Sequence, residues 1–188
     1  DNHDVAIIFG GPMSVNDLNM SYIKYEIDWI NVVLESKKPF LGICLGAQMF
    51  IKNLGGEVEC NTENSSEIGF FNIKPTTSGL NLFKNQKTFF HWHNEGFNLP
   101  NCCELLAEGE RFKNQAFKCN KCFGIQFHPE VNFRLHLLWL YYVSLYSPSK
   151  LKVNGAQNLI KQMNLRIKHN RNISLWLDSF LDNYLLNQ

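Results

Sequence analysis

The chain has 188 residues, of which 45% are hydrophobic and 19% charged, and this composition favours a globular domain with a sizeable core over a disordered or fibrous chain. The formal net charge of +1 excludes a strongly basic or acidic surface, so neither nucleic acid nor a membrane is an expected partner. Apolar runs fall short of the roughly 18 residues that a transmembrane helix needs.

The first predicted element is a strand over residues 5–9, where Val-Ala-Ile-Ile-Phe forms a continuous apolar run. Such a run is typical of a parallel strand that is buried on both faces and has two neighbours. The strand ends in Gly10, Gly11 and Pro12. Because a glycine turn at this end of a central strand can direct a backbone N–H into a site, Gly11 is a candidate oxyanion-hole donor.

An amphipathic helix over 20–37 and a strand over 39–43 are predicted next. Cys44 follows this strand, with Gly42 and Gly46 two residues away on either side, and a helical pattern covers 45–54. This is the G-x-nucleophile-x-G elbow, in which the nucleophile lies at a strained strand-to-helix turn. The helix N-terminus favours a thiolate, so Cys44 is a candidate nucleophile and the N–H of Leu45 a second oxyanion-hole donor.

Residues 57–78 are expected to form short strands and turns, followed by strands over 87–92 and 103–107. A hairpin over 116–127 leads directly into His128, Pro129 and Glu130. In an extended segment, residues i and i+2 point the same way, so His128 and Glu130 can lie on one side. A cysteine with a histidine that a carboxylate orients is the general arrangement for acyl transfer.

The rest of the chain is predicted to be helical. A helix over 135–145 is broken at Ser147-Pro148-Ser149, and helical segments follow over 157–166 and 173–186. Trp176, Phe180 and Tyr184 recur at helical spacing, and we expect them to pack on the domain. Strands alternate with helices, so residues 1–188 are expected to form one α/β domain with a core over 5–147 and a helical tail over 148–188.

Three segments together resemble the class I glutamine amidotransferases: Gly10-Gly11-Pro12, the run from Gly42 to Gln48, and His128-Pro129-Glu130. Further motifs resemble the GMP-synthase-like branch, namely the runs over 11–17, 67–70 and 90–93. The resemblance covers most of residues 5–147. It implies a three-layer, flavodoxin-like α/β fold with a mostly parallel central sheet and flanking helices.

The resemblance also implies the chemistry of a glutaminase that releases ammonia to an unidentified acceptor. Cys44 attacks the side-chain amide of glutamine, His128 takes the thiol proton and passes one to departing ammonia, and Glu130 holds His128. Water then resolves the γ-glutamyl thioester to glutamate. The residues that match glutamine-binding positions of the family are Gly10, Gly11, Gln48, His93, Asn94 and Glu95. The branch usually has His-Gly-Asp where this chain has His93-Asn94-Glu95.

The resemblance supplies no metal or cofactor, and none is expected. His91 and His93 are spaced so that they face one way on a strand, but we do not interpret them as ligands. The six cysteines and a reactive thiol favour a reducing cytoplasm over a disulfide framework. Cys119 and Cys122 have zinc-ligand spacing, but no second pair with that spacing accompanies them. The preferred interpretation is a hairpin turn at Asn120-Lys121 with cross-strand cysteines.

Related domains carry about one βαβ unit before the strand that ends in Gly-Gly-Pro, whereas here that strand begins at residue 5. We therefore expect the natural protein to be longer at its N-terminus by about one βαβ unit, roughly 30 or more residues. The alternative is a truncated domain that a partner chain completes.

Two other functions remain open: a γ-glutamyl peptide hydrolase, and a catalytically silent regulatory module of the same fold. The ammonia acceptor could be supplied by a separate synthetase protein, be a small molecule, or be water. A homodimer is one assembly open to the chain.

Overall fold

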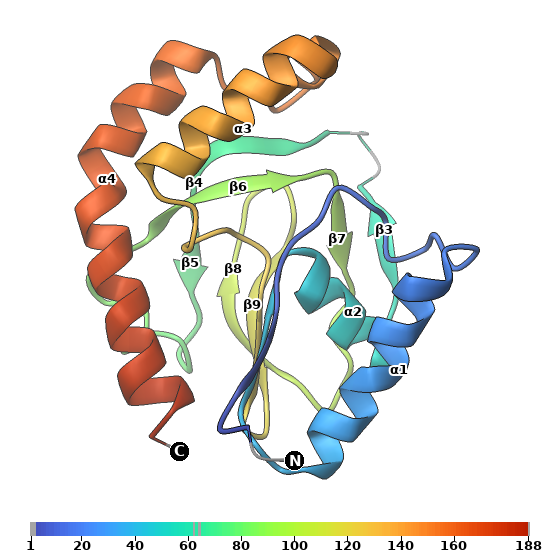
Figure 1. The fold of residues 1–188 in the computed structure, drawn as a ribbon. Helices are drawn as coiled ribbons and strands as arrows, with labels where there is room; N and C mark the ends of the chain where they lie inside the picture. Colours follow the sequence, from blue (N-terminus) through green and yellow to red (C-terminus); the bar gives the residue numbers. More distant parts are fainter. Residues whose placement is uncertain (1–2, 62, 64, 188) are drawn as a thin grey trace.

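The computed structural model of this chain describes residues 3–61, 63 and 65–187. Its centre is a six-stranded sheet in the order β1-β2-β10-β9-β8-β5 (Figure 1). The strands are β1 (Ala6–Ile8), β2 (Phe40–Ile43), β5 (Lys74–Pro75), β8 (Glu104–Glu108), β9 (Asn114–Cys119) and β10 (Cys122–Ile125).

The sheet is mixed, which corrects the expectation of a mostly parallel one. β2 pairs in parallel with β1 and β10, whereas β10 with β9, β9 with β8, and β8 with β5 are antiparallel. Short turns join β8, β9 and β10 in sequence, and such connections allow only antiparallel neighbours. The predicted hairpin is confirmed, with Cys119 and Cys122 directly opposite each other.

Two small antiparallel sheets lie beside the central one. One pairs β3 (Val58–Cys60) with β7 (Glu95–Phe97), and the other pairs β4 (Glu67–Asn72) with β6 (Thr88–His93). β6 and β7 are separated by Asn94 alone, so they bring the segment around His93 to one corner of the molecule.

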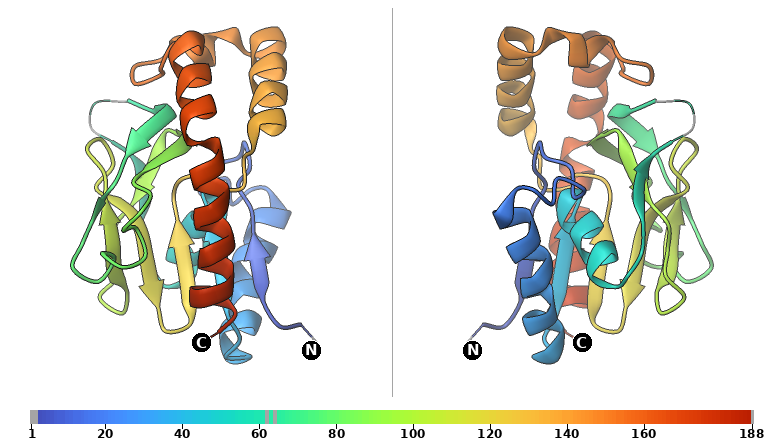
Figure 2. Two further views of the ribbon diagram at one scale, coloured as in Figure 1. Left: turned by 90° about the vertical axis from the view of Figure 1, so that its left-hand side faces the viewer. Right: turned by 90° about the vertical axis from the view of Figure 1, so that its right-hand side faces the viewer.

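Helices cover both faces of the central sheet, which gives the expected three layers (Figure 2). α1 (Ser21–Glu35) and α2 (Leu45–Asn53) pack on one face, α4 (Leu159–Phe180) packs on the other, and α3 (Phe133–Tyr146) and the 3-10 turn η1 (Pro148–Lys152) precede α4. β2 illustrates the alternation: Phe40 belongs to the core beneath α1 and α2, and Leu41 to the core beneath α4. Within the part of the chain that the structure describes, no helix is long and apolar enough to cross a membrane.

The C-terminal tail forms one long helix where two helical segments were predicted. α4 continues into a π-helical turn, η2 (Leu181–Leu185), and no glycine or proline interrupts residues 167–172 between the two predicted segments. The packing of its aromatic face is confirmed. Trp176 and Phe180 are buried, and Tyr184 packs against the same core.

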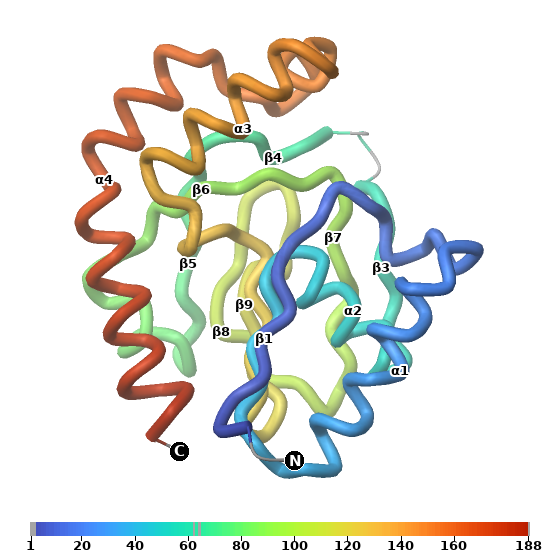
Figure 3. Tube along the Cα trace, viewed as in Figure 1, coloured from blue at the N-terminus to red at the C-terminus, as the bar shows by residue number. Residues whose placement is uncertain are grey.

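In the part of the chain that the structure describes, β1 lies at the edge of the sheet, and its second neighbour, expected from a preceding βαβ unit, stays a prediction. Among the described residues its one strand neighbour is β2, with Ala6 opposite Phe40. The Cα trace shows β1 leading upward into the loop that precedes α1 (Figure 3). Ala6 is buried, whereas Ile7 and Ile8 are only half-buried.

Candidate active site

The elbow at Cys44 is formed by the end of β2 and the start of α2. Cys44 has a backbone φ of 51°, which is a strained conformation for a residue with a side chain. The strain is maintained by close packing at Gly46, where a Cβ would lie 2.2 Å from the backbone oxygen of Ile8. Only glycine at position 46 lets α2 lie this close to β1, so the sequence fixes where Cys44 points.

The Gly10-Gly11 loop lies directly against Cys44 and His128. A Cβ on Gly10 would lie 2.7 Å from Cε1 of the His128 ring and 3.3 Å from Cβ of Cys44. A Cβ on Gly11 would lie 3.1 Å from Cδ2 of Leu45. The two candidate oxyanion-hole donors therefore come from adjoining segments, and the N–H of Leu45 is free of an intrahelical partner because Leu45 begins α2.

His128 lies just beyond the end of β10, between Cys44 and Glu130. Its Nδ1 is 2.7 Å from Oε1 of Glu130, so Nε2 is the ring nitrogen left for the Cys44 thiol. Burial by itself lowers the pKa of His128, but the charge of a Cys44 thiolate and then that of Glu130 outweigh burial and raise it to about 10. At neutral pH the histidine is therefore an imidazolium, whose positive charge lies beside the Cys44 sulfur.

A cavity of about 810 Å³ opens over this pair. Cys44 is only 5% exposed, yet it lines the cavity together with His128. The cavity is also lined by the predicted glutamine-binding residues Gly10, Gly11, Gln48, His93, Asn94 and Glu95. A second cavity of about 340 Å³, beside α4, is lined by no cysteine, histidine or carboxylate.

Gln126 connects Cys44 with Gln48 and was not among the predicted site residues. It is fully buried, and its Nε2 donates to Sγ of Cys44 over 3.5 Å. Its Oε1 accepts a hydrogen bond of 3.2 Å from Nε2 of Gln48, and the same nitrogen donates to the backbone oxygen of Glu95 over 3.2 Å. Gln126 precedes His128 by two residues, so the alternation that grouped His128 with Glu130 also pointed to it.

A buried carboxylate supports the opposite side of Glu95. His93 contacts the Glu95 backbone oxygen through Nδ1 at 2.9 Å and Oε2 of Glu67 through Nε2 at 3.0 Å. His91 contacts the same Glu67 oxygen at 3.1 Å. Burial raises the pKa of Glu67, but the hydrogen bonds from the two histidines outweigh it and lower that pKa well below its usual range.

Glu67, His91 and His93 offer donor atoms within 4.8 Å of one another and have the residue types of a metal site. All three are already engaged with one another, and Gln115 donates to the same Glu67 oxygen over 2.9 Å. Glu67 and His91 therefore support His93, which lines the cavity.

Two tryptophans complete the wall near His128. Trp139 of α3 meets the His128 ring edge-on with centroids 5.3 Å apart, and Trp92 packs against Trp139 at 5.8 Å. Trp92 was expected in the core, and it is half-buried and lines the cavity. The role of Trp139 could not be predicted from the sequence. Apolar residues occur on all sides of its helix, so no single face was indicated.

The chain is similar to known proteins in both sequence and fold. A family model described as glutamine amidotransferase class-I matches residues 1–138. A glutamine-hydrolyzing GMP synthase subunit from Sulfurisphaera tokodaii is 36% identical over 133 residues, which cover 69% of this chain and 69% of that protein. A crystal structure of a glutamine amidotransferase from Thermotoga maritima superposes with a TM-score of 0.86 at 26% identity and covers 99% of this chain and 79% of that one.

The chain is much shorter than some of its relatives. A glutamine-hydrolyzing GMP synthase from Wigglesworthia glossinidia brevipalpis is 34% identical over 139 residues, which cover 66% of this chain but only 25% of that protein.

Proposed function

Because the chain belongs to the class I glutamine amidotransferase family, we propose that it hydrolyses the side-chain amide of glutamine to glutamate and ammonia, with Cys44, His128 and Glu130 as its catalytic groups. The observation that carries the proposal is the position of His128 between Glu130 and Cys44 at the floor of a cavity. An imidazolium beside a thiolate is the state that an acyl-transfer nucleophile requires.

In the first half of the reaction the Cys44 thiolate attacks the amide carbon of glutamine. The backbone N–H groups of Gly11 and Leu45 stabilise the oxyanion that forms. His128 then gives its Nε2 proton to the departing nitrogen, which leaves as ammonia, and a γ-glutamyl thioester remains on Cys44. Glu130 holds the ring through Nδ1 during this transfer.

In the second half, water replaces ammonia next to His128. The neutral imidazole takes a proton from the water as its oxygen attacks the thioester carbonyl. The tetrahedral intermediate collapses, the Cys44 sulfur leaves as a thiolate, and glutamate is released. His128 is again an imidazolium, so the resting ion pair is restored and the protons balance.

Binding of the glutamine is assigned to the residues around Gln48 and Glu95. Gln48, His93 and Glu95 are joined by hydrogen bonds and line the cavity, so they form a preorganised wall. The carboxylate of Glu95 is itself held by Ser14, whose hydroxyl donates to it over 2.8 Å.

The size of the cavity favours one second candidate. At about 810 Å³ it belongs with sites that hold drug-sized ligands, and Tyr142, Val143 and Lys150 line it as well. A γ-glutamyl peptide would use the same catalytic groups and more of this space. Turnover of glutamine compared with γ-glutamyl peptides separates the two substrates.

The direct test is glutamate release from glutamine by the wild-type chain and by Cys44→Ala and His128→Ala. Both variants are expected to lose activity by about 10³-fold or more, because each removes a member of a unit that works together. A glutamine-like diazo ketone should also label Cys44 ahead of the other five cysteines. Even labelling of all six cysteines, or full activity in Cys44→Ala, would contradict the assignment.

A further inference from the structure

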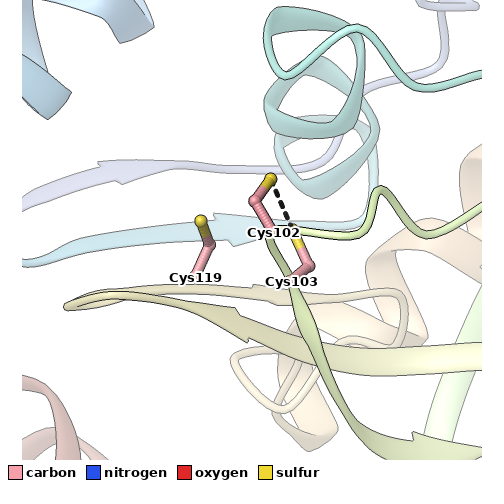
Figure 4. Close-up of side chains that lie close together, drawn as sticks. All are labelled: Cys102, Cys103 and Cys119. Atoms are coloured by element: carbon pink, nitrogen blue, oxygen red, sulfur yellow. Dashed lines mark hydrogen bonds between the residues drawn. The ribbon is translucent and has the colours of Figure 1, made fainter.

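Four of the six cysteines lie at one corner of the sheet, far along the chain from the elbow. The sequence contains the pair Cys119 and Cys122, and the fold brings the adjacent residues Cys102 and Cys103 close to Cys119 (Figure 4). The Sγ atoms of Cys102, Cys103 and Cys119 lie within 4.8 Å of one another, and those of Cys102 and Cys103 are 4.0 Å apart.

Strand register explains why these side chains meet. Glu104 of β8 lies opposite Lys118 of β9, so the next residue along each strand places Cys103 opposite Cys119. Cys119 in turn lies opposite Cys122. Neighbours across strands share a face, and Cys103, Cys119 and Cys122 all contact the core beneath α1 and α2.

Exposure is graded across the group. Cys119 is buried, Cys103 is half-buried, and Cys102 is exposed. Burial first, and the neighbouring thiols second, raise the pKa of Cys103 and Cys119 above the usual range of a thiol. Thiolates that converge in this way repel one another, and a bound cation removes that repulsion.

We propose that Cys102, Cys103 and Cys119 form a binding site for a thiophilic divalent cation of the Zn²⁺ type. Three thiolates supply the protein ligands, and the exposed position of Cys102 leaves the fourth coordination position to solvent. Each ligand loses its proton to the buffer on binding, so occupation of the site releases protons at neutral pH. None of the three residues lines the cavity at Cys44, so the site is independent of the proposed glutaminase reaction.

Occupation of this site would link the turn before β8 to the β9–β10 hairpin. Cys103 ends a turn in which its backbone N–H donates to the backbone oxygen of Pro100 over 2.9 Å. On the other side of the site, β10 leads into His128. A cation held from both sides stabilises the folded chain by mass action, because the separated thiols of the unfolded chain do not form the site.

The test is metal titration of the full chain under reducing conditions, in a Cys44→Ser background that removes the other reactive thiol. Cd²⁺ serves as the spectroscopic probe, because its thiolate charge-transfer band in the ultraviolet reports sulfur ligands, and Zn²⁺ is measured by competition. One equivalent of Cd²⁺ is expected to give the band, Zn²⁺ to displace it, and Zn²⁺ to raise the melting temperature.

Variants locate the ligands. Cys102→Ser and Cys119→Ser should each weaken binding at least tenfold and remove the rise in melting temperature, whereas Cys60→Ser, which changes an exposed cysteine outside the group, should bind like the parent. Cys102 is exposed, so its variant is informative even if Cys119→Ser folds poorly. With Cys44 intact, Cys102→Ser should keep the glutaminase activity of the wild type.

Three outcomes would overturn the proposal: no saturable Cd²⁺ or Zn²⁺ binding in the reduced chain, a thiolate band that survives in Cys102→Ser, or binding that is lost only when the Glu67, His91 and His93 group is changed. The proposed glutaminase activity does not depend on any of them.

Discussion

The charge state of His128 depends on two neighbours, Cys44 and Glu130. The pKa of about 10 is reached because both negative charges outweigh the effect of burial. For Glu130→Gln we expect the alkaline limb of kcat/KM, near pH 10 in the wild type, to move to lower pH. The amide keeps an oxygen for Nδ1 but lacks the charge, so the imidazolium loses its proton earlier. The pH dependence of glutamate release measures this shift.

The control for this prediction is Glu110→Gln, which neutralises an exposed carboxylate away from the cavity. Its alkaline limb should coincide with that of the wild type. An unshifted limb in Glu130→Gln would show that Glu130 does not act on His128 through its charge.

Gln126 offers a second test at the level of single residues. Gln126→Met keeps the length of the side chain but removes the amide that donates to the Cys44 sulfur and accepts from Gln48. A hydrogen bond to a charged group contributes about 1.5–3 kcal/mol, so kcat should fall roughly tenfold to a hundredfold. Alkylation of Cys44 by iodoacetamide at neutral pH should also slow, because the sulfur loses the hydrogen bond that Gln126 donates to it.

Gln162→Met is the matched control for Gln126→Met. Gln162 is an equally buried glutamine, but its Oε1 accepts from His136 between α3 and α4, away from Cys44. The Gln162→Met substitution should change the free energy of unfolding and leave the alkylation rate of Cys44 unchanged. Equal alkylation rates in the two variants would contradict a role for Gln126 at the sulfur.

At the level of elements, α4 is held to the sheet by an aromatic cluster. Trp176 stacks on Phe83 with ring centroids 5.5 Å apart and on Phe180 at 5.2 Å, and its indole N–H donates to the backbone oxygen of Leu82 over 2.8 Å. Trp176→Ala should lower the free energy of unfolding by about 3–5 kcal/mol, since it leaves a cavity and an unpaired carbonyl. Equilibrium urea unfolding measures the change.

The neighbouring residue of α4 provides the comparison. Leu175 is 56% exposed, so Leu175→Ala should change the free energy of unfolding by no more than about 0.5 kcal/mol. Similar losses in both variants would indicate that α4 contributes through helix propensity rather than through this cluster.

At the level of the whole molecule, the chain carries an amidotransferase unit but no phosphate-binding G-x-x-x-x-G-K motif. It spans 25% of one GMP synthase relative and 69% of another relative that is itself a single GMP synthase subunit. The source of the ammonia acceptor stays a prediction, with a separate synthetase protein, a small molecule and water as the alternatives. Incubated alone with glutamine, the chain should release ammonia and glutamate one for one, as measured by paired enzymatic assays.

Addition of a cell extract tests the partner directly. If a separate synthetase protein is present, free ammonia should fall below glutamate because part of the nitrogen is transferred to the acceptor. Unchanged stoichiometry, together with faster turnover of γ-glutamyl peptides than of glutamine, would favour the peptide hydrolase.

The sequence by itself determined the elements on which the candidate site depends. Gly42 and Gly46 predicted the turn at Cys44, and the structure has that turn because no larger residue fits between α2 and Ile8. The alternation of His128 and Glu130 placed both on one side of an extended segment, and the helical spacing of Trp176 and Phe180 predicted a packed face. Each of these signals is local, because it depends on backbone geometry within a few residues.

Only the tertiary structure decided which distant segments meet. The apolar run at β1 predicted a parallel strand, but which strand pairs with it depends on strand order, and the described sheet places β2 beside it. The contact of Gln126 with Cys44 and the convergence of Cys102 and Cys103 on Cys119 depend on pairing between segments far apart in the chain. Register across strands has no counterpart in local spacing, and for that reason the spacing of Cys119 and Cys122 did not predict that Cys102 and Cys103 lie beside Cys119.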